Sequence, residues 1–306
     1  NHCVPCLRYK IIFTHMLRTA ISMSHASRKV LGSPLTTSAK KSRTMSTTAL
    51  SLSGNPVCKL VKPGECQITE DWTTCKLIER VEVSPTSSLL RFDLPNEKEP
   101  LNLSTCACIL AKAELPVAGG GGDEAVIRPY TPVSTNDLVG NFDLLVKNYG
   151  EHGRMSTHLC KLTVGKTVDF KHIPFNVKIQ APFAQKKIGM IVGGTGITPM
   201  VQALHAILGS DAANTTKVSM LYGSKVSTDI LGEELLENWA EKYSDCFSLT
   251  HVLSDEPEDS SWSGKKGFIN KDLIAEHLPP PSEGDNVIVF VCGPPPMYKA
   301  LCGPRD

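Results

Sequence analysis

Acidic residues are absent from the start of this chain. No Asp or Glu precedes Glu65 in the 306-residue sequence, whereas the same stretch carries ten Lys and Arg residues. The remaining 22 basic and 31 acidic residues give residues 65–306 a formal charge of −9, although the whole chain carries +1. Nucleic-acid-binding domains usually present a basic surface. The acidic body therefore argues against nucleic acid as a partner.

Long hydrophobic runs are missing as well. The longest apolar run before residue 65 is Ile11 to Phe13, and no other stretch reaches the roughly 20 residues that a membrane span needs. From Met16 the sequence is rich in Ser, Thr, Ala and Arg, which is typical of a mitochondrial transit peptide. We therefore expect residues 1–64 to form a disordered leader of a mitochondrial protein. A plain basic tail on a cytosolic or peripheral membrane protein is the alternative.

The eleven cysteines lack a metal-binding pattern. Cys3-x-x-Cys6 has no second pair at zinc spacing, and the C-x4-C-x2-C spacing of a plant-type iron–sulfur centre is absent. We expect no metal site and mostly buried, reduced thiols, as in a compartment where few disulfides form.

Short strand-like segments fill residues 65–180. Turn-prone residues such as Ser84-Pro85 and the glycines 119–122 separate them. The predicted strands are 73–83, 88–94, 105–115, 125–133, 142–149 and 167–173, with one short helix at 155–162. Six short strands with little helix between them predict an antiparallel, six-stranded β-barrel or a sandwich.

Strands and helices alternate in residues 181–306. The expected strands are 188–192, 218–222, 249–253 and 287–291, and the expected helices are 199–208, 229–243 and 271–277. This alternation predicts a doubly wound α/β domain with a parallel sheet. Ligands of such domains bind at the carboxyl ends of the strands.

One stretch of this second domain, IGMIVGGTGITPM at 188–200, has a clear ligand-binding pattern. It is predicted to be a buried strand, a glycine turn and a helix that begins with Thr198 as its N-cap and Pro199 in its first position. Glycines and a helix N-terminus together suit a nucleotide phosphate. Pro199 departs from the G-x-G-x-x-G fingerprint, so a purely structural turn is the alternative.

Three further motifs contain residue types that suit nucleotide binding. RPYTPVS at 128–134 combines an arginine fork for phosphate with an aromatic face. GRMS at 153–156 begins the short helix, and CGPPPM at 292–297 follows the last strand. Each has a structural alternative when taken singly, such as a surface ion pair for Arg128 or a buried thiol for Cys292.

In this order, RPYTPVS, GRMS, GGTGITPM and CGPPPM resemble the NADH–cytochrome b5 reductase family of the ferredoxin–NADP reductase-like superfamily. The resemblance runs from about residue 62 to the end, and LNLSTCACILAKAEL at 101–115 is similar to mitochondrial members. It implies an N-terminal FAD barrel, residues 65–180, and a C-terminal NADH domain, residues 181–306. It also implies hydride transfer from NADH to flavin and single-electron transfer to a haem protein such as cytochrome b5.

The family's cofactor contacts carry over onto matching positions. For FAD these are Arg128, Pro129, Tyr130, Thr131, Val146, Lys147, Tyr149, Gly153, Arg154, Met155, Ser156 and Thr198. For NADH they are Gly194, Thr195, Gly196, Asp229, Cys292, Gly293 and Pro294. Thr131 and Cys292 are the residues expected to act at the reacting rings.

Asp229 is expected to decide between the two nicotinamide cofactors. The resemblance implies that its carboxylate accepts hydrogen bonds from the adenosine ribose, where it would repel the 2′-phosphate of NADPH. The structural alternative is an acidic residue favoured by the dipole at a helix N-terminus.

We expect the protein to be a monomer, and we expect it to dock the haem protein through basic side chains. The candidate lysines are Lys161, Lys166, Lys171, Lys178, Lys186 and Lys187; a solvated surface is the alternative.

The chain departs from the family where Cys302 to Asp306 replace a terminal aromatic residue, and we expect an incomplete C-terminus. The rival readings are another NADH-dependent diaphorase-type reductase, a nitrate-reductase flavin fragment, for which no upstream domains are present, and a non-catalytic scaffold.

Overall fold

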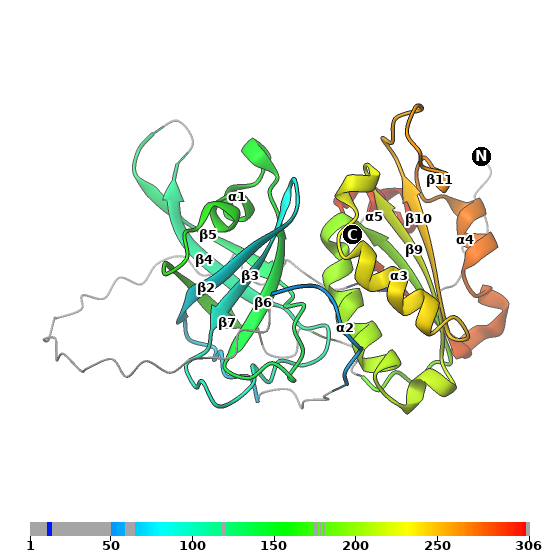
Figure 1. The fold of residues 1–306 in the computed structure, drawn as a ribbon, viewed down its shortest axis with the longest axis horizontal. Helices are drawn as coiled ribbons and strands as arrows, with labels where there is room; N and C mark the ends of the chain where they lie inside the picture. The colour runs from blue at the N-terminus through cyan, green and yellow to red at the C-terminus, as the bar shows by residue number, and fades with distance from the viewer. Residues whose placement is uncertain are drawn as a thin grey trace, which may run out of the picture.

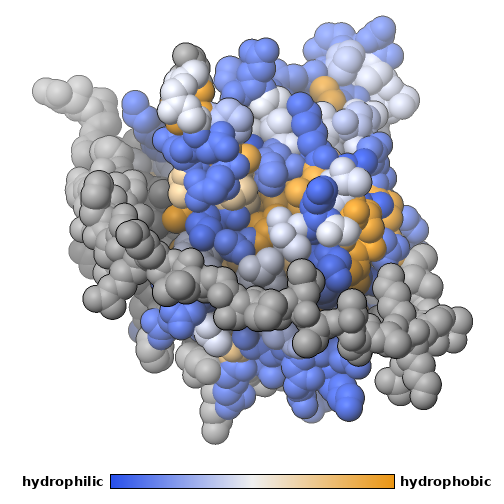
Figure 2. Space-filling view, turned by 90° about the vertical axis from the view of Figure 1, so that its left-hand side faces the viewer, coloured by the Kyte–Doolittle hydropathy of each residue, from blue (hydrophilic) through white to orange (hydrophobic). Residues whose placement is uncertain are grey.

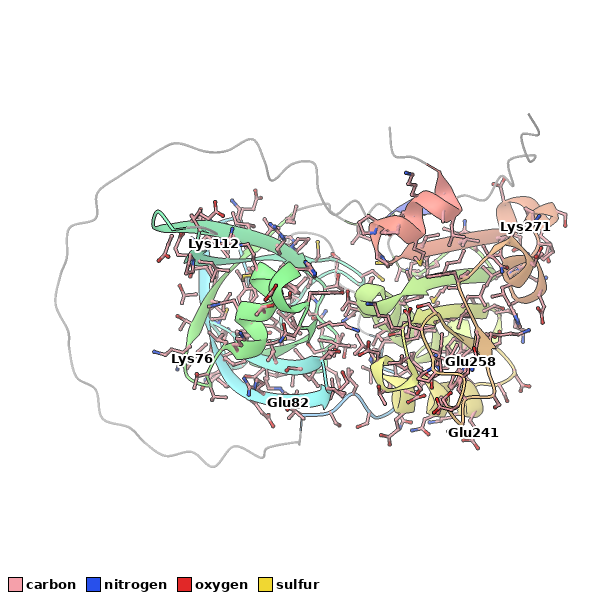
Figure 3. All side chains as sticks on the ribbon, turned by 90° about the horizontal axis from the view of Figure 1, so that it is seen from above. Lys76, Glu82, Lys112, Glu241, Glu258 and Lys271 are labelled. Atoms are coloured by element: carbon pink, nitrogen blue, oxygen red, sulfur yellow. The ribbon has the colours of Figure 1, made fainter. Side chains whose placement is uncertain are left out.

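The computed structural model describes the backbone of residues 11–13 and residues 50–58, 65–117, 120–173, 177, 179 and 181–303. Most of the predicted leader, Lys178 and the last three residues lie outside this part of the chain. Two domains lie side by side in Figure 1, one built on antiparallel and the other on parallel strands. Charged side chains such as Lys76, Glu82 and Glu258 project from their outer surfaces (Figure 3).

The first domain is a six-stranded antiparallel sheet in the order β5-β4-β7-β2-β3-β6. The strands are β2 (Thr73–Ser84), β3 (Ser87–Asp93), β4 (Ile109–Pro116), β5 (Asp123–Tyr130), β6 (Asn141–Lys147) and β7 (Thr167–His172). The six predicted strands are confirmed. Residues 105–108, predicted as strand, instead form a turn because Cys106 has a φ of +66°.

An aromatic cluster fills the interior of this domain. Phe92, Phe142 and Phe170 are fully buried, with ring centroids 5.0 to 5.6 Å apart. Helix α1 (Arg154–Lys161) contributes Met155 and Leu159 to the same core. It packs against both edge strands, β5 and β6, and so covers the side of the barrel where these strands do not pair.

The second domain contains a parallel sheet in the order β1-β12-β8-β9-β10-β11. Its strands are β1 (Ile11–Phe13), β8 (Lys187–Gly193), β9 (Lys217–Ser224), β10 (Phe247–Leu253), β11 (Lys265–Lys266) and β12 (Val287–Cys292). Its α-helices are α2 (Ile197–Leu208), α3 (Glu233–Lys242), α4 (Lys271–His277) and α5 (Pro295–Cys302). The doubly wound fold is confirmed.

Alternation along β8 assigns the helices to opposite faces of the sheet. Ile188, Met190 and Val192 belong to one hydrophobic cluster with residues of α2 and α3. Ile191 belongs to another cluster with residues of α4 and α5. Successive side chains of a strand point to opposite faces, so each pair of helices covers one face.

The start of α2 differs from its prediction. A 3₁₀ turn, η2 (Gly194–Gly196), follows β8, and Gly196 rather than Thr198 is the N-cap. The φ of +51° at Gly194 lets the chain turn directly into the helix. Thr198 therefore lies within the first turn, where its Oγ1 donates to the carbonyl of Thr195 at 3.2 Å.

Residues 50–58 cross the second domain although they fall within the predicted disordered leader. Leu50 is buried in the cluster of α2 and α3, and Trp239 Nε1 donates to Gly54 O at 2.9 Å. Val57 N donates to His205 Nδ1 at 3.1 Å. This segment, blue in Figure 1, differs from the prediction because its few apolar residues find partners on the second domain. Strand β1 also falls within the predicted leader, and its backbone pairs with β12.

Candidate active site between the two domains

Two glycine turns meet at the carboxyl ends of β8 and β12. A side chain on Gly196 would enter the carbonyl of Cys292, and a Cβ on Gly193 would lie 2.8 Å from Pro294 Cδ. Only glycine permits this approach of the two backbones. The structure thus brings together two motifs that are almost 100 residues apart, GGTGITPM and CGPPPM. Neighbouring parallel strands explain this, since β8 pairs directly with β12.

The first domain reaches this edge through the end of β6. Tyr149 OH and Thr195 Oγ1 are 3.1 Å apart, and they join the segment after β6 to the glycine turn. Tyr222 OH, buried behind the turn, donates to Gly194 O at 3.2 Å. The side chain of Tyr149 is about half exposed, at 47%, so its ring remains accessible beside the turn.

The first motif forms the end of β5 and the bend that follows. Thr131 is buried at 3% exposure, and its Oγ1 has no hydrogen-bond partner among the described residues. Burial raises the pKa of the Tyr130 hydroxyl, which therefore stays protonated. Arg128 is exposed and donates to the carbonyl of Ile127 at 2.7 Å, so its guanidinium retains donors for a phosphate. Pro129 pairs with Leu110 in the β4–β5 ladder.

The GRMS motif begins α1 as predicted. Gly153 is the N-cap and provides no side-chain cap; a Cβ there would lie 2.7 Å from Tyr149 Cβ. Arg154 turns back to form an ion pair with Glu124 and to donate to Pro116 O at 2.7 Å. Met155 is buried in the core, whereas Ser156 is half-buried. The first turn of α1 accordingly offers backbone N–H groups to an anion.

Asp229 is held by the first domain rather than standing alone. Its Oδ1 accepts from Thr86 Oγ1 and its Oδ2 from Lys147 Nζ, each at 2.8 Å. Burial alone would raise the pKa of Asp229, but these two bonds outweigh it and lower the pKa. The carboxylate is thus ionised. Lys147, predicted to contact FAD, lies against the predicted NADH residue, and its FAD role stays a prediction.

Cys292 is half-buried near two other thiols. Cys106 Sγ donates to Pro199 O, in the first turn of α2, at 3.2 Å. The carbonyl oxygen of Cys292 lies at the same end of this helix, beside Gly196. Burial raises the pKa of the Cys106 and Cys108 thiols to about 12. These two are therefore poor nucleophiles at neutral pH, as expected for reduced structural thiols.

The candidate lysines do not share one surface. Lys161 and Lys166 are exposed on the first domain, and Lys171 Nζ lies 5.9 Å from the ring centroid of Trp72. Lys186 and Lys187 instead lie at the amino end of β8, opposite the glycine turn, and Lys187 pairs with Glu283 at 2.7 Å. Lys186 and Lys187 therefore lie at the other end of β8 from the glycine turn, and the docking role of the six lysines stays a prediction. Lys178 is not among the described residues.

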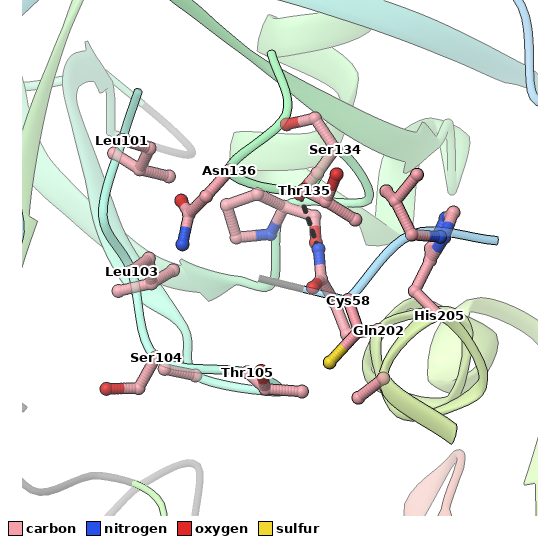
Figure 4. A pocket seen from close by; sticks show the side chains of 14 residues that line it. Cys58, Leu101, Leu103, Ser104, Thr105, Ser134, Thr135, Asn136, Gln202 and His205 are labelled. Carbon is pink, nitrogen blue, oxygen red and sulfur yellow. Dashed lines mark hydrogen bonds between the residues drawn. The ribbon is translucent and has the colours of Figure 1, made fainter. Parts of the chain in front are cut away.

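A pocket elsewhere contains none of the predicted cofactor residues. It lies between the segment 57–58, two loops of the first domain and α2, where Gln202 Nε2 donates to Pro132 O at 2.8 Å (Figure 4).

The sequence did not single out Thr86, Gln202 or His205 as interface residues. Thr86 carries only a turn signal, and the other two resemble ordinary polar positions of a helix.

The site fits the two predicted cofactors. The buried, unpartnered hydroxyl of Thr131 and the open first turn of α1 suit a flavin nucleotide. The glycine turns of β8 and β12, with an ionised carboxylate nearby, suit a second nucleotide.

No group of three potential metal ligands exists among the described residues, and no described helix is long and apolar enough to span a membrane.

Comparison with known families identifies one oxidoreductase domain in each part of the chain. Residues 74–174 match the oxidoreductase FAD-binding domain, and residues 190–303 match the oxidoreductase NAD-binding domain. NADH-cytochrome b5 reductase 2 of Scheffersomyces stipitis is 37% identical over 258 residues, 84% of this chain and 81% of that protein. NADH-cytochrome b5 reductase 1 of the same yeast is 41% identical over 225 residues, covering 74% and 75% of the two chains.

Solved structures agree with these relatives. The cytochrome b5 reductase domain of Ulva prolifera nitrate reductase superposes with a TM-score of 0.65 and 29% identity, over 79% of this chain and 92% of that one. The CS-b5R domains of human Ncb5or, in an NAD⁺ form, give a TM-score of 0.59 and 25% identity, over 75% and 64% of the two chains. The chain belongs to the NADH–cytochrome b5 reductase family.

Proposed function

We propose that this protein is an FAD-dependent enzyme that oxidises NADH and passes single electrons to a haem protein. The carrying observation is the meeting of the glycine turns of β8 and β12, joined to the first domain by Tyr149 and Thr195. Two nucleotide sites, one from each domain, thereby face one seam.

The chain's own residues bind and orient the cofactors. Arg128 and the first turn of α1 would neutralise the FAD pyrophosphate, and Tyr130 would pack on the ring system. Thr131 Oγ1 would gain a partner. When bound, FAD accepts one hydride, which carries two electrons, and releases these electrons singly, which is chemistry that no side chain supplies. Cys292, Gly293 and Pro294 would limit where the nicotinamide lies, while Gly194, Thr195 and Gly196 leave room for its phosphates.

Purified protein tests this function directly. A yellow protein whose NADH–ferricyanide reductase activity follows its flavin content supports it. Colourless protein that neither binds FAD nor reduces ferricyanide would instead favour a non-catalytic scaffold. Ferricyanide activity without reduction of cytochrome b5 would favour another diaphorase-type reductase of the same superfamily.

Cytochrome b5 is the proposed acceptor, on the strength of the names that the relatives carry. In Figure 2 the visible atoms on this side of the molecule are mostly hydrophilic, with a hydrophobic patch towards the right of the view. Exposed Lys161 ends α1, whose other end carries the FAD motif, and Lys166 follows close behind. We assign docking of an acidic haem protein to Lys161 and Lys166. Their double replacement by Glu should slow cytochrome b5 reduction at low salt but not ferricyanide reduction, whereas an equal effect on both would contradict the assignment.

A mitochondrial location is proposed from the acid-free, Ser/Thr-rich leader alone. Fusion of residues 16–49 to a fluorescent protein tests it. Import into mitochondria is the expected result, and a diffuse cytosolic signal would contradict it. The monomeric state predicted from the sequence is tested by light scattering of the purified protein.

A further inference from the structure

Two donors of the first domain, Thr86 and Lys147, hold the carboxylate of Asp229 from the second domain. We call this pair of donors the fork. Thr86 and Lys147 lie on the neighbouring strands β3 and β6, or directly beside them, since Ser87 pairs with Lys147 in the ladder. Asn148 N also donates to Thr86 O at 2.7 Å. Backbone pairing thus fixes the positions from which the Thr86 and Lys147 side chains reach the carboxylate.

Asp229 fills this fork from the other domain. It ends the 3₁₀ turn η4 (Ser227–Asp229), which follows β9. Both oxygens are engaged at 2.8 Å, and the exposed fractions of the Lys147 and Asp229 side chains are 14% and 13%. A mostly enclosed carboxylate with one donor on each oxygen has little freedom to rotate.

The fork leaves part of the carboxylate available. An ionised carboxylate has about four acceptor positions, and Thr86 and Lys147 occupy two of them. Two hydroxyl groups of a ribose could therefore be accepted without breaking the fork. A group that is held in its binding conformation loses less conformational freedom when a ligand arrives.

We propose that Thr86 is a specificity-determining residue that positions Asp229 for the adenosine ribose of NADH across the domain boundary. This inference rests on the proposed function, because it requires that the second domain binds NADH. Thr86 does not touch the reacting rings in this account. It acts through Asp229, so its loss should change dinucleotide affinity and leave the turnover number nearly unchanged.

Thr86→Val tests the proposal, because valine keeps the shape and removes the donor. The dissociation constant of NAD⁺, which has the same adenosine ribose but cannot reduce the flavin, should rise roughly three- to tenfold when measured by quenching of protein fluorescence, the range of one hydrogen bond. Thr86→Ser should restore most of the affinity. The preference for NADH over NADPH should fall in Thr86→Val, because a carboxylate held only by Lys147 can turn away from a 2′-phosphate.

A matched control exists within the first domain. Thr74 Oγ1 donates to Asp169 Oδ1 at 2.7 Å, the same chemistry as Thr86 and Asp229 but within one domain. Thr74→Val should leave NADH affinity unchanged. In an Asp229→Ala background, Thr86→Val should have no further effect.

Three results would overturn the proposal: wild-type affinity in Thr86→Val, no rescue by Ser, or an undiminished effect in Asp229→Ala. Wild-type protein that fails to bind NADH would instead overturn the proposed function. Thermal unfolding of each variant, followed by circular dichroism, separates a loss of affinity from a loss of folded protein.

Discussion

Asp229 combines a structural and a recognition role in one side chain. It pairs with Lys147 across the domains, and as an ionised group it disfavours a second negative charge beside it. Asp229→Thr should therefore shift the ratio of kcat/KM values for NADH and NADPH towards NADPH by roughly tenfold, equivalent to about 1.4 kcal/mol. Steady-state kinetics with both cofactors measure this ratio. Exposed Asp255, after β10, supplies the control Asp255→Thr, and an unchanged ratio in Asp229→Thr would refute the assignment.

His251 makes the second domain sensitive to acid. It is buried at 9% exposure, and neither ring nitrogen has a hydrogen-bond partner among the described residues. Burial lowers the pKa of His251 to about 4. In the unfolded chain His251 binds a proton near pH 6.5, whereas in the folded protein it stays neutral down to about pH 4. The contribution of neutral His251 to the free energy of unfolding is therefore complete above pH 6.5 and is lost as the pH falls towards 4.

Replacement of His251 tests this pH dependence. The wild-type protein should lose about 2 kcal/mol at pH 5 relative to pH 7.5 through this residue. His251→Phe should reduce the fall of the unfolding midpoint over this range. Exposed His152 provides the control His152→Gln, which should retain the wild-type pH dependence. Equal pH profiles for wild type and His251→Phe would contradict the account.

At the scale of the element, the turn between β8 and α2 depends on contact with β12. Gly196→Ala would force a methyl group against the carbonyl of Cys292. We expect a cost of about 3 kcal/mol or more, above the usual range for overpacking because backbone must move. Unfolding midpoints and NADH affinity should both fall. Gly223→Ala, whose Cβ would meet Ile269 Cδ1 at an ordinary 3.5 Å, is the matched control; similar losses in both variants would contradict the argument.

Most elements were predictable from the sequence because their patterns are local. Alternation along β7 places Val168, Phe170 and His172 inside, and the 3.6-residue spacing of α3 buries Leu235, Leu236 and Trp239. The start of α2 was misplaced by two residues, since Thr198 and Pro199 are acceptable both before and inside a first turn. The turn at Cys106 gave no signal, because a positive φ is rare for a residue other than glycine.

At the scale of the whole molecule, the motifs predicted the site but not its cross-domain contacts. The bond from Thr86 to Asp229 joins residues 143 positions apart and depends on how two separately folded domains meet. The segment 50–58 was assigned to the leader by its serine-rich composition, yet Leu50 lies in the core of the second domain. Composition reports an average, whereas one or two apolar residues suffice to fix a short segment.

The proposed function requires electrons to pass from NADH to a flavin where the two domains meet. An anaerobic titration of the purified, FAD-loaded protein with NADH tests it most directly. We expect the flavin absorbance near 450 nm to bleach with about one equivalent of NADH, and far less readily with NADPH. A flavin spectrum that stays unchanged in excess NADH, in protein whose circular dichroism shows an intact fold, would contradict it.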